Sequence, residues 1–167
     1  MHEIVPWRGR GMDMSAGTGT LGFWHHHAGI SVPDLDAAIA WYGRVLDFQL
    51  LRRYPVESIP AQIAVMGNGP LHIELFEVPG AAPLPAERRE PNLDLRTHGN
   101  KHVAFAVTDV AALAAELQRR GADLVWLRTF PFGSNAFFRD CAGNLLEFVQ
   151  VAAQPSGVAG LAVGGGA

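Results

Sequence analysis

The sequence has little cysteine, little charge and no long hydrophobic run. Its one cysteine, Cys141, cannot form a disulfide within the chain, so a disulfide-rich secreted scaffold is not expected. Charged residues make up only 17% of the 167 residues, whereas disordered chains are typically rich in charge. No segment approaches the roughly 18 consecutive apolar residues that a membrane-spanning helix needs. We therefore expect a folded protein without membrane association.

An excess of positive charge is also lacking. The 13 Lys and Arg residues are fewer than the 16 Asp and Glu residues, which gives a formal net charge of −3. Because binding to a phosphate backbone requires a surplus of basic side chains, nucleic-acid binding is not expected. The N-terminal segment contains no apolar stretch of the secretory type, so we expect a cytoplasmic location.

Hydrophobic residues make up 49% of the chain, enough for the core of one domain. Residues 1–21 and 153–167 are rich in Gly and Ala without hydrophobic periodicity, and we predict flexible tails there. A Pro-rich connector over residues 80–98 separates two modules, at 22–79 and 99–152. Its prolines argue against a regular helix or a central strand in the connector.

The two modules share a pattern that indicates an internal duplication. A shift of 75 residues aligns HAGISV with HVAFAV and His27 with His102. In each module a strand-like alternation is followed by an amphipathic helix and three further strands, with Thr108 as the expected N-cap of the second helix. The expected fold is α+β, with paired βαβββ modules that form an open curved sheet around a metal-binding cleft and carry their helices outside.

Strand alternation places four polar side chains on the face opposite the bulky apolar residues. These side chains are His27, Glu74, His102 and Glu147. Small neighbours such as Gly29 and Ala104 leave space beside them, as a substrate cleft requires. Two imidazoles and two carboxylates suit a divalent Mn, Fe, Co, Ni or Zn ion. Any one of the four taken alone is more often a surface or core residue of a strand than a metal ligand; the paired arrangement is what indicates a metal site.

Other histidines lie near these positions. His72 precedes Glu74 by two residues and shares its face, so it is a candidate for proton transfer because imidazole titrates near neutrality. A partly exposed histidine without a role is the alternative. His25 shares the face of His27 at the beginning of the strand, whereas His26 is expected to point the other way.

At these residues the chain resembles the vicinal oxygen chelate superfamily, which includes glyoxalase I, methylmalonyl-CoA epimerase, extradiol dioxygenases and bleomycin-resistance proteins. The resemblance covers residues 22–152 and rests on the motifs HHAGISVPDLDAAIAWYGRVLDF, HIELFEV, GNKHVAFAVTDV and FRDCAGNLLEFVQ. It implies paired βαβββ modules around a metal, with ligands at His27, Glu74, His102 and Glu147.

The complete ligand set resembles glyoxalase I and the epimerase more closely than the extradiol dioxygenases, which lack a carboxylate at the position of Glu74. The resemblance therefore implies a metal-dependent lyase or isomerase acting on a small molecule. In such enzymes the metal polarises a carbonyl group and a base moves a proton at the adjacent carbon. Glu147, or else Glu74, takes the role of that base.

Two other functions remain open. One is a non-haem Fe(II) ring-cleaving dioxygenase with a facial triad of His27, His102 and Glu147. The other is a metal-free resistance protein that sequesters a small hydrophobic molecule. The site lies either within one chain or across a homodimer, where one copy supplies His27 and Glu74 and the other supplies His102 and Glu147. The substrate and any role of glutathione or coenzyme A are not apparent from the sequence.

Overall fold

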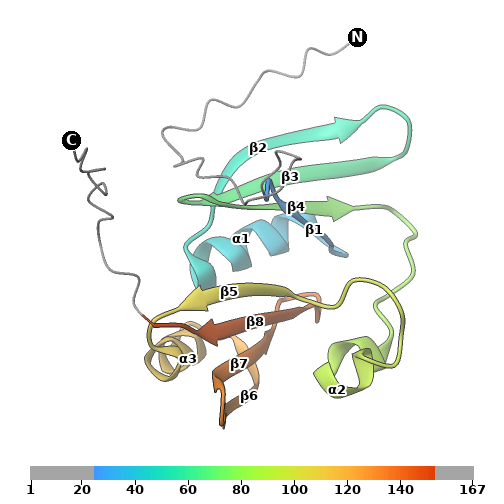
Figure 1. Ribbon diagram of the computed structural model, residues 1–167. Helices are drawn as coiled ribbons and strands as arrows, with labels where there is room; N and C mark the ends of the chain where they lie inside the picture. The colour runs from blue at the N-terminus through green and yellow to red at the C-terminus, as the bar shows by residue number, and fades with distance from the viewer. Residues whose placement is uncertain (1–24, 153–167) are drawn as a thin grey trace, which may run out of the picture.

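The computed structural model describes residues 25–152, so the predicted tails fall outside the described residues. Two modules with the same order of elements follow one another (Figure 1). The first comprises β1 (Ala28–Ser31), α1 (Leu35–Leu46), β2 (Gln49–Val56), β3 (Ala61–Asn68) and β4 (Leu71–Glu77). The second comprises β5 (Val103–Val107), α3 (Val110–Arg119), β6 (Asp123–Phe130), β7 (Gly133–Arg139) and β8 (Leu145–Gln150).

Each module forms its own open four-stranded sheet. The strand orders are β1-β4-β3-β2 and β5-β8-β7-β6. In both sheets the first strand runs parallel to the last, and the remaining pairs are antiparallel. Gly29 lies opposite Glu74 in one sheet, and Ala104 lies opposite Glu147 in the other. The predicted α+β class and the paired βαβββ modules are therefore confirmed.

Both long helices begin with the same capping arrangement. The side chain of Asp34 accepts a hydrogen bond from the Ala37 N–H at 2.9 Å, and Asp109 accepts one from Ala112 at 2.9 Å. An aspartate at the N-cap satisfies a backbone donor that the helix itself leaves unpaired. The prediction of Thr108 as the N-cap is wrong by one residue, because Asp109 provides the capping oxygen.

A second acceptor ties each helix to the last strand of its module. Glu77 Oε2 accepts a hydrogen bond from the Leu35 N–H at 2.7 Å. In the second module, Gln150 Oε1 accepts from the Val110 N–H at 3.1 Å. The strands that carry Glu74 and Glu147 are thus fixed against the helices that follow β1 and β5.

One hydrophobic core joins the two modules. It includes the buried residues Leu35, Tyr42 and Val45 of α1 together with Val110 and Leu117 of α3. The buried Tyr42 hydroxyl also donates a hydrogen bond to Asp140 of the second module at 2.9 Å. Burial, together with the Asp140 carboxylate, raises the pKa of Tyr42, so the hydroxyl keeps the proton that it donates.

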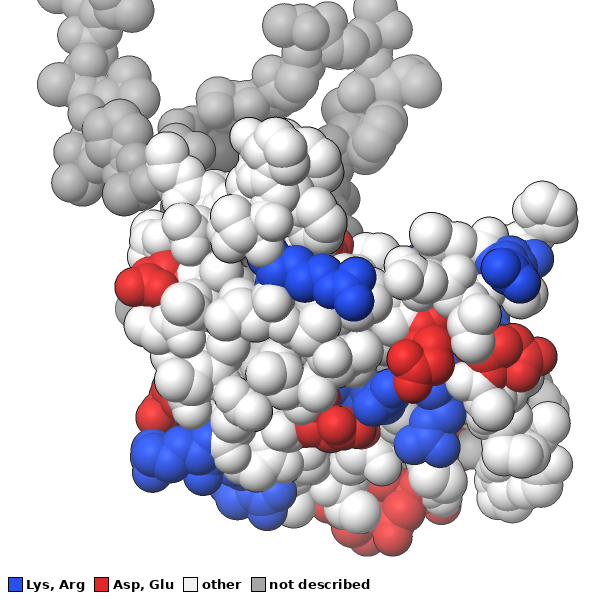
Figure 2. Space-filling view, turned by 90° about the horizontal axis from the view of Figure 1, so that it is seen from below, with Lys and Arg blue, Asp and Glu red and all other residues white. Residues whose placement is uncertain are grey.

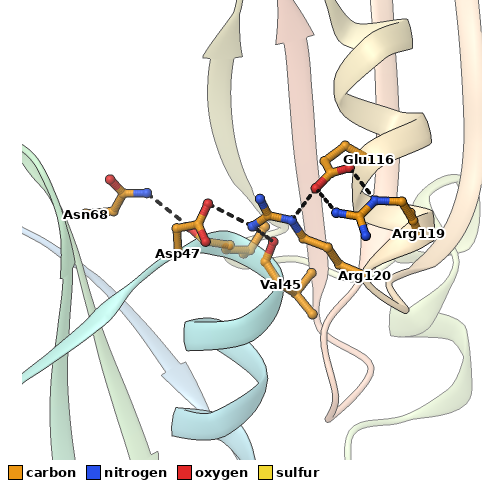
Figure 3. Close-up of polar contacts among 7 residues, drawn as sticks. Val45, Asp47, Asn68, Glu116, Arg119 and Arg120 are labelled. Carbon is orange, nitrogen blue, oxygen red and sulfur yellow. Dashed lines mark hydrogen bonds and ion pairs between the residues drawn. The ribbon is translucent and has the colours of Figure 1, made fainter.

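An ion-pair network links the C-terminal ends of α1 and α3 (Figure 3). Arg120 contacts Asp47 at 2.7 Å and donates to the Val45 carbonyl at 3.3 Å. Hydrogen bonds from Arg119 and then Arg120 lower the pKa of Glu116 to about 2. Basic side chains also lie beside acidic ones on the face of the molecule shown in Figure 2.

The connector contains a 3₁₀ helix, η1 (Ala86–Arg89), and a single helical turn, α2 (Pro91–Asp94). The expectation that proline excludes a helix is wrong at α2, because the turn begins at Pro91, where a missing N–H carries no cost. Arg139 and Lys101 hold the connector to the second module by hydrogen bonds to the Arg89 carbonyl at 2.8 Å and the Asp94 carbonyl at 2.7 Å. No helix within residues 25–152 is long and apolar enough to cross a membrane.

Candidate metal centre

The first predicted ligand pair is formed by His27 and Glu74. His27 directly precedes β1, and Glu74 lies in β4, the strand that pairs with β1. His27 Nε2 lies 3.1 Å from Glu74 Oε2, and both side chains are partly exposed. The parallel pairing of the two strands therefore brings together residues that are far apart in the sequence.

The second pair, His102 and Glu147, repeats this arrangement in the other module. His102 directly precedes β5, and its Nε2 atom lies 2.9 Å from Glu147 Oε2. The imidazole ring packs edge-on against Phe137 of β7, with 4.9 Å between the ring centroids. This packing fixes the plane of the ring while Nε2 faces the carboxylate.

The geometry of each pair fits two ligands of one divalent ion. An imidazole nitrogen and a carboxylate oxygen that each lie about 2.1 Å from an ion, at a right angle, are about 3 Å apart. The His–Glu distances of 3.1 and 2.9 Å match that separation. Nitrogen and oxygen donors together suit Mn, Fe, Co, Ni or Zn. Each pair is thus a candidate half-site (hereafter a half-site) with two possible ligands.

Within the described residues, the two half-sites do not combine into one centre. Among residues 25–152, no group of three or more His, Cys, Asp or Glu side chains is arranged to hold a metal ion. His27 and Glu74 belong to the first module, whereas His102 and Glu147 belong to the second. The structure therefore brings the four predicted ligands together as two separate pairs.

Glu147 is oriented by a residue that the sequence analysis missed. Asn135 of β7 donates from Nδ2 to Glu147 Oε1 at 2.7 Å, and its Oδ1 accepts from Trp126 Nε1 at 3.3 Å. Because an indole N–H can only donate, the amide oxygen must face Trp126 and the NH₂ group must face Glu147. The Arg128 guanidinium lies 4.1 Å from the centre of the Trp126 ring and helps to hold it.

Glu74 is held by a different group. The Tyr54 hydroxyl of β2 donates to Glu74 Oε1 at 3.2 Å. Burial and then the Glu74 carboxylate raise the pKa of Tyr54, so the hydroxyl remains a donor near neutral pH. Strand alternation alone could have placed both Tyr54 and Asn135 on a face, but only the register between strands shows which carboxylate each one meets.

Three further histidines, His25, His26 and His72, lie near the first half-site. His26 Nδ1 lies 2.6 Å from His27 Nδ1, so the prediction that His26 points away is wrong. The reason is that His26 precedes β1, where strand alternation does not apply. His72 stacks on His26 at 6.5 Å and lines a cavity together with His25 and His102. Burial, and then the neighbouring His26, lower the pKa of His72.

Comparisons with known proteins agree with this architecture. A model of the Glyoxalase/Bleomycin resistance protein/Dioxygenase superfamily matches residues 24–148. The uncharacterized protein PA2024 of Pseudomonas aeruginosa is 32% identical over 130 residues, which cover 73% of this chain and 84% of that protein.

Two solved structures extend the comparison. A glyoxylase/bleomycin resistance protein/dioxygenase domain from Frankia sp. EAN1pec is 28% identical, with a TM-score of 0.62, over 77% of this chain and 97% of that one. Glyoxalase I from Zea mays is 26% identical, with a TM-score of 0.60, over 78% of this chain but only 45% of that enzyme. The chain therefore belongs to the Glyoxalase/Bleomycin resistance protein/Dioxygenase superfamily, the vicinal oxygen chelate superfamily that its motifs resemble.

Proposed function

We propose that this protein is a metal-dependent lyase or isomerase that removes a proton from the carbon next to a carbonyl group of a small-molecule substrate. The observation that supports the proposal is the repeated His–Glu pair, with N···O distances of 3.1 and 2.9 Å that suit ligands of a divalent ion. The chain's complete set of two histidines and two carboxylates favours a lyase or isomerase over a dioxygenase with a facial triad. Glyoxalase I is among the solved structures that the chain resembles.

We further propose that the complete centre forms between two copies of the chain. One copy supplies His27 and Glu74, and the other supplies His102 and Glu147. A two-fold symmetric dimer then contains two identical centres, since each copy contributes both kinds of half-site. The absence of any group of three ligands within residues 25–152 favours this arrangement over a centre within one chain.

The roles of the side chains follow from their contacts. The two His–Glu pairs would hold the divalent ion, which would supply Lewis-acid chemistry at the substrate carbonyl. Glu147 accepts the substrate proton, and Asn135 keeps its carboxylate aimed at the half-site. Glu74, held by Tyr54, is the alternative base. His72 lines a cavity together with His102 and provides an imidazole that can pass the proton on.

Metal removal tests the proposed function directly. Purified protein is expected to contain one divalent ion per chain by elemental analysis, because each dimer forms two centres. Treatment with a chelator should abolish turnover, and Mn, Fe, Co, Ni or Zn should restore it. The assays use hemithioacetals, acyl-CoA epimers and catechols, the last with oxygen uptake.

Two outcomes would overturn the proposal. Oxygen uptake with a catechol and Fe(II) would instead identify a dioxygenase. A protein that takes up no divalent ion but binds a small hydrophobic molecule tightly would be a binding protein.

A further prediction concerns the residue that orients Glu147. Replacing Asn135 by Ala removes the hydrogen bond to Oε1, and we expect the affinity for Co²⁺ to fall about ten- to hundredfold. The exposed Asn92 of α2 provides a matched control, since Asn92→Ala should leave the affinity unchanged. Competition with a chromophoric chelator measures the Co²⁺ affinity of both variants. An unchanged affinity in Asn135→Ala would show that the hydrogen bond does not position the ligand.

A further inference from the structure

A cavity of about 430 Å³ lies between the two modules and the connector. Its polar lining includes the cations Arg88 and Lys101, the amides Asn100 and Asn144, and the imidazoles of His27 and His102. No Asp or Glu side chain is among the described residues that line it. The electrostatic character of the cavity wall therefore favours an anion over a cation or a neutral ligand.

The two cations are fixed in place by the buried carboxylate of Asp94. Arg88 Nε lies 2.9 Å and Lys101 Nζ lies 3.5 Å from the same oxygen, Asp94 Oδ1. The other oxygen, Oδ2, is buried and has no hydrogen-bond partner among the described residues. Both positive groups therefore converge on one oxygen of the carboxylate.

Arg88 retains free hydrogen-bond donors, whereas all three donors of Lys101 are already engaged. The Lys101 ammonium group has three N–H bonds, and it donates to the Asp94 carbonyl, Asp94 Oδ1 and the Thr97 carbonyl. A guanidinium has five N–H bonds, and within the described part of the chain Arg88 donates only to Asp94 Oδ1 and the Asn100 carbonyl. Arg88 thus has free donors in the planar arrangement that binds a carboxylate with two hydrogen bonds.

The charge and the rest of the lining restrict the anion further. Arg88 and Lys101 together with Asp94 carry a net charge of one positive unit, which balances a monoanion better than a phosphate dianion. The remaining wall is largely apolar and includes Ile30, Leu84 and Leu145. We propose that this cavity is a binding site for a small aliphatic carboxylate, with the Arg88 guanidinium as its anchor and Lys101 as a fixed neighbouring charge.

Calorimetry on chelator-treated protein tests this site independently of the proposed metal chemistry. The probes are isovalerate, its neutral isostere isovaleramide, and inorganic phosphate. Isovalerate is expected to bind about tenfold or more tightly than isovaleramide, as hydrogen bonds to charged groups require. NMR shift changes caused by isovalerate should centre on the backbone amides of Asn100 and Lys101, next to the cavity.

Variants of neighbouring arginines complete the test. Arg88→Gln should weaken isovalerate binding about tenfold or more, and Arg88→Lys, which keeps the charge but not the planar donors, should have an intermediate effect. Arg89→Gln is the matched control, because Arg89 is exposed, follows Arg88 in the sequence and lies outside the cavity lining. This variant should bind isovalerate as tightly as the wild type does.

Three results would overturn the proposal: equal affinities for isovalerate and isovaleramide, tighter binding of phosphate than of isovalerate, or wild-type affinity in a folded Arg88 variant. If Arg88→Gln does not fold, the proposal is still tested by the Arg88→Lys variant and by the comparison of isovalerate with isovaleramide and phosphate on the wild-type protein. A metal-free protein that is inactive in every enzyme assay but binds isovalerate as described would refute the proposed function and leave this site standing.

Discussion

Two inactive variants of this protein, His27→Ala and His102→Ala, are expected to regain activity when they are refolded together. Each variant alone loses one ligand from every centre, so its turnover should fall about a hundredfold or more. A mixed dimer carries both defects in one centre and none in the other, because in the proposed dimer each centre combines His27 and Glu74 of one copy with His102 and Glu147 of the other. Random pairing makes half of the dimers mixed. Since one of the two centres in each mixed dimer is intact, the mixture should show about a quarter of wild-type activity.

The matched control combines two variants of the same half-site, His27→Ala and Glu74→Ala. Each centre of their mixed dimer lacks one of these two ligands, so no activity should return. Size-exclusion chromatography establishes that dimers form in both mixtures. Recovery in the control, or none in the first mixture although dimers are present, would contradict a centre that is shared between two copies.

Replacing Glu147 by Gln is expected to lower turnover by about a hundred- to ten-thousandfold at saturating metal. The amide has the shape of the carboxylate and can still accept the hydrogen bond that Asn135 donates at 2.7 Å to the native residue. It cannot accept a proton from the substrate. The measurement is kcat with each variant loaded with Co²⁺, so that weaker metal binding does not contribute to the loss.

Two further variants separate the roles of the carboxylates. Glu74→Gln should weaken metal binding but lower kcat less than Glu147→Gln does, if Glu147 is the base. Glu87→Gln, on the exposed surface of the connector, should leave kcat unchanged. A kcat for Glu147→Gln close to that of the wild type would exclude Glu147 as the base, and a larger loss in Glu74→Gln would assign the role to Glu74.

Much of the fold could be predicted because its signals are local. The alternation in LHIELFEV and LLEFVQ predicted strands that the structure forms at Leu71–Glu77 and Leu145–Gln150. The same alternation placed Ile73 and Leu75 in the core, where both are buried. Alternation has a fixed period of two residues, so it reports which side chains share a face without knowledge of the rest of the fold.

The surroundings of the carboxylates could not be predicted in this way. That Asn135 meets Glu147 depends on the pairing of β7 with β8, where Phe137 lies opposite Glu147 and Asn135 opposite Val149. That Tyr54 reaches Glu74 depends on the way in which β2 and β4 flank β3. Register and strand order are set by turns and by packing between distant segments, which a single sequence pattern does not contain.

The sequence by itself determined that each module offers one imidazole and one carboxylate, because duplication and alternation are written along the chain. Only the tertiary structure decided how these ligands group. The parallel pairing of β1 with β4 and of β5 with β8 brings His27 to Glu74 and His102 to Glu147, while the shared core and the hydrogen bond between Tyr42 and Asp140 fix the modules against each other. Strand pairing and module packing both depend on residues far apart in the sequence, and within residues 25–152 they leave the four side chains as two pairs and not as one group of three or more.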